Sequence, residues 1–450
     1  MVSAQEVTAT GEAEHREPFA LDNPPNNPKL DKLNKLAITF RSPYTRSPWT
    51  KEDNPFEPGA GTKPQELVGR ELILADAEAA IGRGLRGRPI RGQVFYGLRG
   101  VGKTVLLREV GEIARGRDAV VVDLETPEHK KLTEILVPAV RQLLLKFSAS
   151  EQAKEALRQA AAALQSFASI FKVKVAGIGI EVKGAAKGVA DSGDLEIDVA
   201  DLLATVGETA KAAGSGVVLA LDEMQYLSEE ELSALITAIH RVNQRSLPLG
   251  LFGAGLPQLL GLAGAAKSYS ERLFTFVEIG ALSTGEAGKA IRDPIVKTGA
   301  SINQAAIDYI IAKSQGYPYF LQEWGFRAWN AARKSPITKA DVVTAEPRTI
   351  ESLDKGFFRV RFDQLTHSEQ LYLRAMAELG PGPHKSGEVA KVLGKTAPQA
   401  SPVRAQIIAK GMAYGGQYGM VHFSVPLFDE FMKRALPGFK PKAPAPRRKK

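Results

Sequence analysis

Eight residues, Gly97-Leu98-Arg99-Gly100-Val101-Gly102-Lys103-Thr104, carry the strongest structural signal in this sequence. They fit the pattern G-x-x-x-x-G-K-[ST], in which glycines let the backbone curl until several N–H groups face one phosphate chain. A strand-like run, Gln93–Tyr96, precedes them, and a run with helical period, Thr104–Ile113, follows. The N-terminus of that helix would add about half a positive charge. The sequence therefore predicts a phosphate-binding loop between a strand and a helix.

A triphosphate site also needs a metal ligand and a base. The apolar run Gly216–Leu221 ends in two acids, Asp222 and Glu223. We predict that Asp222 and the hydroxyl of Thr104 hold Mg²⁺, while Lys103 reaches the β- and γ-phosphates. Glu223 points differently from its neighbour on an extended chain and is the candidate that polarises the attacking water. Two acids after an apolar strand are commonplace alone, so the prediction depends on their pairing with the phosphate loop.

Short apolar runs elsewhere predict an α/β fold. They are apolar throughout, which is typical of strands covered on both faces in a mostly parallel sheet. The strand candidates are Val94–Tyr96, Ala119–Leu124, Val217–Leu221, Leu249–Gly253 and Phe274–Ile279. A long helical stretch, Leu132–Phe167, separates the second from the third. The alternating segment Phe171–Lys183 contains two central glycines and predicts an edge hairpin.

Composition limits the class of protein. The chain has 450 residues, of which 44% are apolar and 24% charged, as in soluble globular proteins with two or three domains. The absence of cysteine excludes disulfides, thiolate nucleophiles and cysteine-ligated zinc, and the six histidines lack metal-ligand spacing. The uncharged stretch Leu247–Ala266 contains two prolines and several glycines, so we expect a strand and a helix there, not a membrane span. With no signal sequence at the N-terminus, we expect a cytoplasmic protein without a membrane partner.

The chain divides into segments by composition and periodicity. Residues 1–63 are rich in Pro, Asn and charge and predict an extended arm that builds no core. We place the other boundaries as follows: a P-loop core at 64–280, an all-helical segment at 281–360, a small separate domain at 361–437 and a basic disordered tail at 438–450.

The domain at 361–437 has the pattern of a winged helix-turn-helix. Three helices are expected, the third at Pro402–Gly411, followed by a two-stranded wing at Met412–Tyr414 and Met420–Val425. The candidate contacts to double-stranded DNA are Gln399, Ser401, Arg404, Gln406 and Lys410. The charge of this domain is only modestly positive, and many winged helices instead pack against or dock other proteins. Contact with DNA and a protein-partner or self-assembly role both remain open.

The order of motifs resembles bacterial ATP-binding proteins related to origin-recognition-type AAA+ ATPases and to STAND signalling ATPases. The resemblance covers about residues 54–437. Besides the phosphate loop it is carried by the segments Leu67–Glu71, Leu219–Gln225, Leu251–Pro257, Tyr269–Phe274 and Gly316–Gln322. It implies a P-loop NTPase three-layer sandwich, AAA+-like, with a helical lid at 281–360, a C-terminal winged helix, and ATP with Mg²⁺ as ligands.

The resemblance also implies roles for single residues. The nucleotide-binding set would be Val68, Gly69 and Arg70 beside the adenine, then Gly97, Arg99, Gly100, Val101, Gly102, Lys103, Thr104 and Val105 of the loop, and Pro318 of the lid. Arg272 stands where the family often carries an arginine finger, although it is equally placed to cap a helix or to pair with Glu271. The sensor-1 place, Gly253-Ala254-Gly255, offers no polar side chain, and no residue matches sensor-2.

These features predict ATP binding with slow Mg²⁺-dependent hydrolysis that drives a conformational switch coupled to the winged helix. Two alternatives stay open. One is a DNA-binding regulator that uses ATP only as a structural ligand, and the other is an oligomerising signalling or defence ATPase that acts through protein partners.

Overall fold

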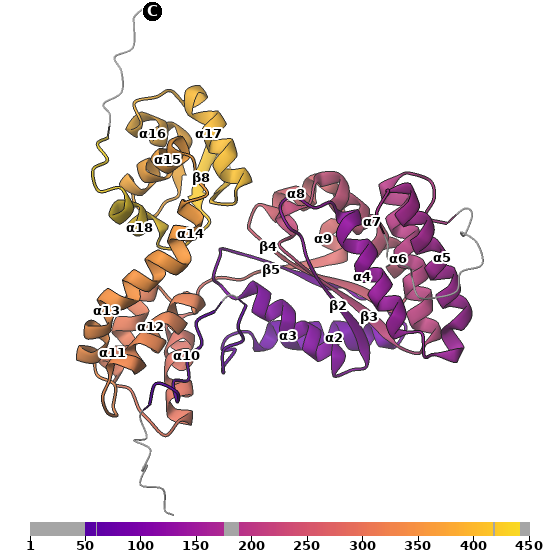
Figure 1. The fold of residues 1–450 in the computed structure, drawn as a ribbon, viewed down its shortest axis with the longest axis horizontal. Helices are drawn as coiled ribbons and strands as arrows, with labels where there is room; N and C mark the ends of the chain where they lie inside the picture. The colour runs from indigo at the N-terminus through magenta and orange to yellow at the C-terminus, as the bar shows by residue number, and fades with distance from the viewer. Residues whose placement is uncertain (1–49, 60, 175–188, 417–418, 442–450) are drawn as a thin grey trace, which may run out of the picture. The chain divides into compact units, whose positions relative to one another are not determined.

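The computed structural model describes residues 50–59, 61–174, 189–416 and 419–441 (Figure 1). Most of the predicted N-terminal arm, the predicted hairpin at Phe171–Lys183 beyond residue 174, and the tail after residue 441 lie outside these ranges. The described residues belong to one compact unit. Everything described below belongs to that unit.

A five-stranded parallel sheet forms the centre of the core. Its strands are β1 (Gly92–Tyr96), β2 (Ala119–Glu125), β3 (Gly216–Asp222), β4 (Leu249–Gly255) and β5 (Phe274–Glu278), in the order β2-β3-β4-β1-β5. All neighbouring pairs are parallel. The five predicted strands and their parallel arrangement are therefore confirmed, with ends that differ by no more than two residues.

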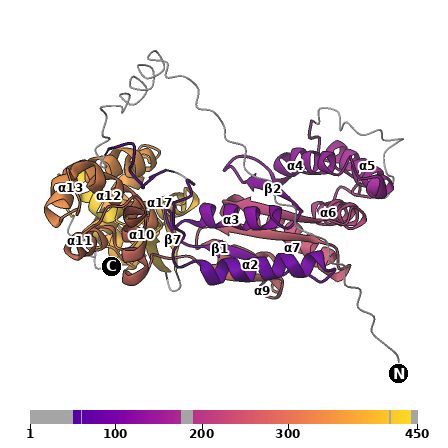
Figure 2. The same ribbon diagram turned by 90° about the horizontal axis from the view of Figure 1, so that it is seen from below.

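Helices cover both faces of this sheet (Figures 1 and 2). Along β3, Val218 and Ala220 pack with α2 and α3, whereas Val217, Leu219 and Leu221 pack with the helices of the opposite layer. The core helices are α2 (Glu71–Leu85), α3 (Lys103–Arg115), α4 (Leu132–Lys146), α5 (Lys154–Ile170), α6 (Leu195–Ala212), α7 (Glu229–Gln244), α8 (Leu259–Ala266) and α9 (Ser270–Leu273). The predicted helical stretch Leu132–Phe167 is thus two helices, joined by a turn that includes η1 (Glu151–Ala153).

The segment after β5 is helical as predicted. It contains α10 (Thr284–Lys297), α11 (Gln304–Ser314), α12 (Pro318–Ala331), α13 (Lys339–Leu353), the π-helical turn η3 (Asp354–Phe358) and α14 (Arg359–Phe362). Capping boxes start α10 at Ser283 and α13 at Thr338, and Pro318 fits the first turn of α12 because its missing N–H is not needed there. The predicted boundary at residue 360 falls inside the continuous helical run α13–η3–α14.

The C-terminal module contains α15 (His367–Glu378), α16 (Ser386–Val392), α17 (Ala397–Ala409) and α18 (Phe428–Ala435). A three-stranded antiparallel sheet, β6 (His384–Lys385), β8 (Met420–Phe423) and β7 (Ala413–Gly415), packs with them. The predicted start of the third helix at Pro402 is wrong. The helix begins at Ala397 because Thr396 and Gln399 form a capping box, and Pro402 lies inside it.

A segment that we call the strap, residues 50–59 and 61–66, joins the lid to the core. Phe56 is 1% exposed and packs against Gly325 of α12, and the Asn54 amide donates to Phe326 O at 3.0 Å. At the other end, Arg108 of α3 donates to Gly61 O at 2.8 Å. The expectation that residues 1–63 build no core is therefore wrong for this part, because Phe56 is a core side chain.

Among the helices of the described residues, none is both long enough and apolar enough to cross a membrane.

Candidate nucleotide-binding site

The phosphate loop leaves β1 and enters α3 with a backbone that favours glycine, as Gly97 and Gly102 illustrate. A Cβ on Gly97 would stand 2.0 Å from Ile279 O, so only glycine allows this close approach. Gly102 is the N-cap of α3 and has a φ of +92°, a left-handed conformation that other residues adopt at a cost. Together they leave a concave run of backbone amides directly before the helix N-terminus.

The Lys103 side chain is 9% exposed and lies along the inside of this loop. Its Nζ donates to Gly97 O at 3.0 Å and to Leu98 O at 2.9 Å. Burial lowers the pKa of Lys103 to about 8, against the opposing effect of Glu223 and Asp222. The Lys103 ammonium is thus held at the loop by two neutral carbonyl acceptors. A bound polyanion would stabilise its positive charge.

Thr104 and Asp222 meet at the carboxyl edge of the sheet. The Thr104 hydroxyl donates to Asp222 Oδ2 at 2.6 Å, and the backbone N–H of Glu223 donates to Asp222 Oδ1 at 2.8 Å. Burial raises the pKa of Asp222 above the ordinary range, more than the Thr104 hydrogen bond lowers it. A buried carboxylate and a hydroxyl side by side are oxygen donors that suit Mg²⁺.

Glu223 faces the pocket from a strained position. Its φ is +55°, in the left-handed region, at the start of η2 (Met224–Tyr226). The Gln225 amide donates to the Glu223 carboxylate, and the same Gln225 accepts a 2.9 Å hydrogen bond from Leu256 N after β4. Gln225 therefore fixes the Glu223 carboxylate to the end of β4, the place where the sequence offered no polar side chain.

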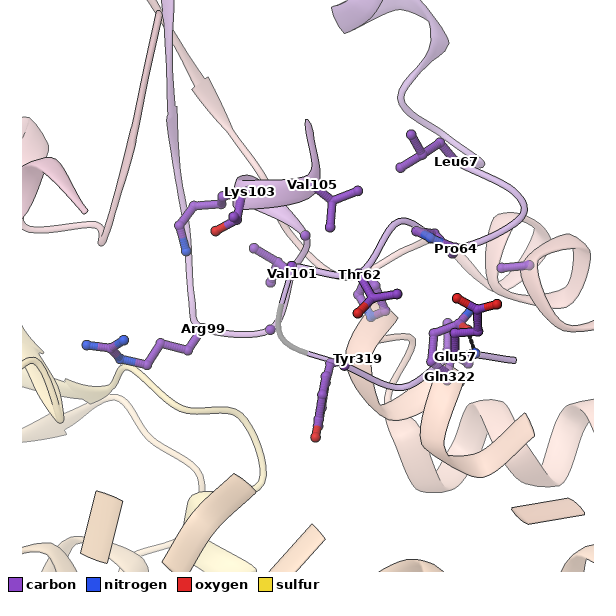
Figure 3. Close-up of a pocket in the computed structure, with 18 of the residues that line it drawn as sticks. Glu57, Thr62, Pro64, Leu67, Arg99, Val101, Lys103, Val105, Tyr319 and Gln322 are labelled. Carbon is purple, nitrogen blue, oxygen red and sulfur yellow. Dashed lines mark hydrogen bonds between the residues drawn. The ribbon is translucent and has the colours of Figure 1, made fainter. Parts of the chain in front are cut away.

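The loop opens into a cavity of about 330 Å³ (Figure 3). Most of the predicted nucleotide-binding residues line it, namely Val68, Arg70, Arg99, Gly100, Val101, Gly102, Lys103, Thr104, Val105 and Pro318, together with Glu223. Gly69, Gly97 and Asp222 are not among the lining residues, although Gly69 and Asp222 adjoin lining residues in sequence. Their roles toward a nucleotide remain predictions.

The strap and the lid contribute walls that no motif indicated. They supply Glu57, Thr62, Pro64 and Glu66 from the strap, and Tyr319 and Gln322 from α12. Glu57 N donates to Gln322 Oε1 at 3.2 Å, and Tyr319 N donates to Gly100 O at 3.1 Å (Figure 3). Phosphate loop, lid and strap are thereby joined around one cavity.

Arg361 is a positively charged pocket residue that the sequence motifs did not indicate. It stands on α14, its guanidinium lies 4.3 Å from the ring centroid of Phe357, and it donates to Phe357 O. Burial lowers the pKa of Arg361 to about 10, with a further lowering by Arg99. Two guanidinium groups near one another at a cavity rim favour an anionic occupant.

Arg99 connects the loop to the C-terminal module. Its backbone N–H donates to Ser424 O at 3.0 Å, and its guanidinium donates to the Tyr226 hydroxyl at 3.1 Å and lies 3.8 Å from Glu223. The side chain extends from the loop toward the C-terminal ribbon (Figure 3). Its Nε is buried and has no hydrogen-bond partner among the described residues. The loop is therefore in direct contact with the module that follows the lid.

Arg272 lies far from this pocket. It is exposed on α9, just before β5 begins, at the amino edge of a parallel sheet whose carboxyl edge carries the phosphate loop. It forms no ion pair with Glu271 in the described part of the chain. As an arginine finger, it has to act on a nucleotide bound to another copy of the chain.

The candidate DNA contacts on α17 are in part committed to internal contacts. Arg404 donates to Met420 O at 3.2 Å, and Lys410 pairs with Glu369 at 2.8 Å and donates to Gln364 O. Gln399 Oε1 accepts the capping hydrogen bond from Thr396 N. Only Ser401 and Gln406 are exposed without such bonds. Contact between these five residues and DNA remains a prediction.

A metal would find two protein ligands here. Thr104 and Asp222 offer oxygen, and the described residues contain no cluster of three or more His, Cys, Asp or Glu that suits a metal ion. This set fits Mg²⁺ held jointly by protein and phosphate oxygens, the usual arrangement for a cation that keeps several waters.

Comparison with protein families finds two matches. Residues 66–252 match the AAA ATPase domain, and residues 355–432 match a domain of unknown function (DUF8462). Among curated proteins, none matches this chain. The first match covers the phosphate loop, Asp222, Glu223, the strands β1 to β3 and the start of β4, so this part of the chain is an AAA ATPase-like domain.

Solved structures with a similar fold include the Walker-type ATPase PABY2304 of Pyrococcus abyssi, with a TM-score of 0.54 and 14% identity over 84% of this chain and 99% of that one. The Aeropyrum pernix ORC1 protein, solved in complex with DNA, has a TM-score of 0.41 and 15% identity over 82% of this chain and 94% of its own. The Thermotoga maritima RuvB Holliday junction branch migration motor has a TM-score of 0.42 and 16% identity over 85% of this chain and 100% of its own. At these identities the first likeness supports the α/β P-loop NTPase-like fold alone.

Proposed function

We propose that the protein binds ATP with Mg²⁺ in the cavity beside the phosphate loop, hydrolyses it slowly, and uses the nucleotide state to control the C-terminal module. The observation that carries this proposal is the convergence of Lys103, Thr104 and Glu223 on one cavity, with Asp222 hydrogen-bonded to Thr104, within an AAA ATPase-like domain. The amides of residues 100–104 and the Lys103 ammonium would bind the β- and γ-phosphates. Val68, Arg70 and Pro318 would surround the adenine ring of the nucleotide.

Hydrolysis needs a water aligned with the γ-phosphorus and a group that accepts its proton. Glu223 lines the cavity and is fixed by Gln225, so its carboxylate is the proposed base. The new bond forms between the water oxygen and phosphorus, and the bond to the ADP oxygen breaks. Held by Thr104 and Asp222, Mg²⁺ would supply neutralisation of the phosphate charge. Arg99 and Arg361 lie on the cavity rim, where they would offset the charge that develops on the γ-phosphoryl oxygens.

Slow turnover follows from what the site lacks. Beyond Gln225, the end of β4 brings no polar side chain to the cavity, and Arg272 lies at the opposite edge of the sheet. A site that has a base, but no polar side chain from β4 and no arginine finger from its own chain, fits a nucleotide-held switch better than a fast motor.

The switch would act through Arg99. Its N–H bonds Ser424 O, and its guanidinium lies between Glu223 and the C-terminal module. A bound γ-phosphate competes for the same guanidinium, so the contact with the module depends on the nucleotide. Three helices followed by an antiparallel hairpin support a winged-helix assignment for this module, and DNA or protein contact would be its output.

One observation favours a second candidate, an oligomerising ATPase that acts through protein partners. Arg272 is exposed at the edge of the sheet away from its own cavity. If it contributes to hydrolysis, two copies of the chain must meet with that edge facing a neighbour's cavity. Turnover that rises with protein concentration and is lost in Arg272→Ala would support this candidate.

The deciding experiment compares the wild-type chain with Glu223→Gln. ATP binding, measured calorimetrically with Mg²⁺, should be retained, whereas phosphate release should fall by about 10²-fold or more from a rate below about 1 per second. Glu229→Gln, an exposed acid on α7, is the matched control and should keep the wild-type rate. Equal phosphate release by Glu223→Gln and wild type would reject hydrolysis by this site, and a failure of the wild type to bind ATP would reject the proposal altogether.

A further inference from the structure

A cluster of arginines lies at the amino edge of the central sheet, opposite the nucleotide cavity. We call it the arginine edge, and it consists of Arg83, Arg86, Arg88, Arg91 and Arg272. The first four surround the connection from α2 to β1, and Arg272 precedes β5. These positions meet because β1 and β5 are parallel neighbours with Gly92 opposite Phe274, and because the Arg91 guanidinium donates to Glu271 O at 2.9 Å.

The arginine edge carries charge that its own surroundings do not neutralise. All five residues are exposed. In the part of the chain that the structure describes, the side chains of Arg83, Arg86, Arg88 and Arg272 form no ion pair or hydrogen bond. Two nearby arginines behave differently, since Arg117 pairs with Glu78 at 2.6 Å and Arg245 with Glu208 at 3.0 Å. Because Glu78 and Glu208 are already paired with these two arginines, the arginine edge keeps guanidinium groups that have no acidic partner among the described residues.

The backbone that bears these side chains is fixed. Gly87 N donates to Gly84 O at 3.0 Å and Arg88 N donates to Arg83 O at 3.1 Å, which closes the C-terminal end of α2. Gly87 has a φ of +72° that suits this turn, and Pro89 restrains the next residues. A ligand that engages these arginines therefore orders side chains but no backbone, which lowers the entropic cost of binding.

We propose that the arginine edge binds the sugar–phosphate backbone of double-stranded DNA without reading its sequence. The cluster contains arginine and no lysine, and the guanidinium fork matches phosphate oxygens in pairs. The proposal assigns the contact to the core domain, whereas Arg404 of α17 is hydrogen-bonded to Met420, and Lys410, which follows α17, is bonded to Gln364 and Glu369.

The make-up of the surface distinguishes DNA from other polyanions and from protein. The exposed large apolar side chains of the described residues include none within 76–91 or 267–278, and interfaces between proteins usually have an apolar centre. No exposed aromatic ring accompanies the arginines, so there is no platform on which unpaired bases would stack. A surface of charge without apolar or aromatic groups fits the outside of a duplex.

The position of the arginine edge leaves the nucleotide cavity free. The phosphate loop follows the carboxyl end of β1, and the arginines precede its amino end. DNA and ATP therefore bind at separate places, and the proposal does not depend on hydrolysis.

The test is a salt titration of binding between the full-length chain and a short duplex of random sequence. In Arg83→Gln/Arg86→Gln/Arg88→Gln, three phosphate contacts are removed, and the slope of log affinity against log salt should become shallower by about 2.7. Near 0.1 M salt the affinity should fall on the order of 10²-fold. The matched control is Arg333→Gln/Lys334→Gln/Arg348→Gln, which makes the same change in charge on exposed positions of the lid and should keep the wild-type slope.

Three outcomes would overturn the proposal: no measurable duplex binding by the wild type, equal slopes for the two triple variants, or an unchanged slope with self-association lost in sedimentation. The last result would assign the arginine edge to contact between copies of the chain. An unchanged ATP-induced shift in melting temperature shows that the triple variant is folded. If the triple variant does not fold, the single variants Arg86→Glu and Arg88→Glu, both in the exposed loop, replace it. Each should weaken duplex binding more than Arg333→Glu does.

Discussion

The Thr104 hydroxyl donates a 2.6 Å hydrogen bond to the Asp222 carboxylate, although 118 positions separate the two residues in the sequence. One ends the phosphate loop and the other ends β3, the next strand but one in the sheet. Because all strands are parallel, both residues arrive at the same edge. This contact brings the two halves of the proposed ATP site together.

Replacement of Lys103 by alanine should remove most of the stabilisation by nucleotide. ATP–Mg²⁺ at about 1,000 times its dissociation constant should raise the free energy of unfolding of the wild type by about 4 kcal/mol. Lys103→Ala should show less than about 1 kcal/mol in urea unfolding with and without nucleotide. Lys154→Ala, on the exposed face of α5, serves as the control. A full shift in Lys103→Ala would mean that ATP binds elsewhere.

Gln225 should influence catalysis and leave affinity unchanged. Its amide links the Glu223 carboxylate to Leu256 N, and Gln225→Ala frees that carboxylate. We expect kcat to fall about 10-fold, as for a misplaced general base, while the ATP dissociation constant stays within about twofold. Gln244→Ala, in the last turn of α7, should change neither quantity. Equal losses in kcat and affinity would instead indicate a general structural defect.

The free energy of unfolding should rise with pH because of Lys103. Burial lowers the pKa of Lys103 to about 8 from the model-compound value of 10.5, so between these pH values the unfolded chain binds more protons than the folded one. Below that window the ammonium is charged in both the folded and the unfolded chain, and the free-energy cost of its burial lowers the stability in full. Above the window the amine is neutral in both states and this cost is absent. Urea unfolding of the wild type and of Lys103→Met should therefore diverge below the window and converge as the pH rises through it. A pH-independent difference would contradict this assignment.

Gly411→Ala should loosen the C-terminal module. A Cβ at Gly411 would stand 3.0 Å from Arg99 Nη2 and 3.0 Å from Leu256 Cδ1, at a φ of +62°. We expect a cost of about 1 kcal/mol and roughly fivefold faster hydrogen exchange in β7 and β8, with β1 and β3 unaffected. Gly387→Ala, in the same module and with open space where the new Cβ would lie, is the control. Unchanged exchange in β7 and β8 would show that the Arg99 contact does not hold the module.

The parts of this protein that sequence could predict are those whose signal is local. The phosphate loop has fixed spacing, the strands are short apolar runs, and Asp222 directly follows one of them. Each signal lies within about ten residues of the feature it predicts. Parallel pairing then determines which of these features meet, because parallel strands present their carboxyl ends at one edge.

The parts that sequence missed depend on contacts between distant residues. Arg361 enters the cavity because the π-helical turn η3 and α14 continue α13 toward the loop, and its sequence neighbours indicate only a charged helix. Gln225 matters because Glu223 adopts a left-handed φ beside it. The ion pair between Lys410, the C-cap of α17, and Glu369 of α15 also joins residues far apart in the sequence, and no local signal indicates it.

The strap sets a limit on how far the lid and the core can separate. Phe56 is buried in the lid, and Gly61 accepts a hydrogen bond from Arg108 of the core. Only five peptide bonds separate these two anchors. A fully extended chain of that length reaches roughly 17 Å. While both anchors hold, the cavity can open only by a hinged motion that keeps Phe56 and Gly61 within this distance of each other. Nucleotide exchange must then take place within that limited opening.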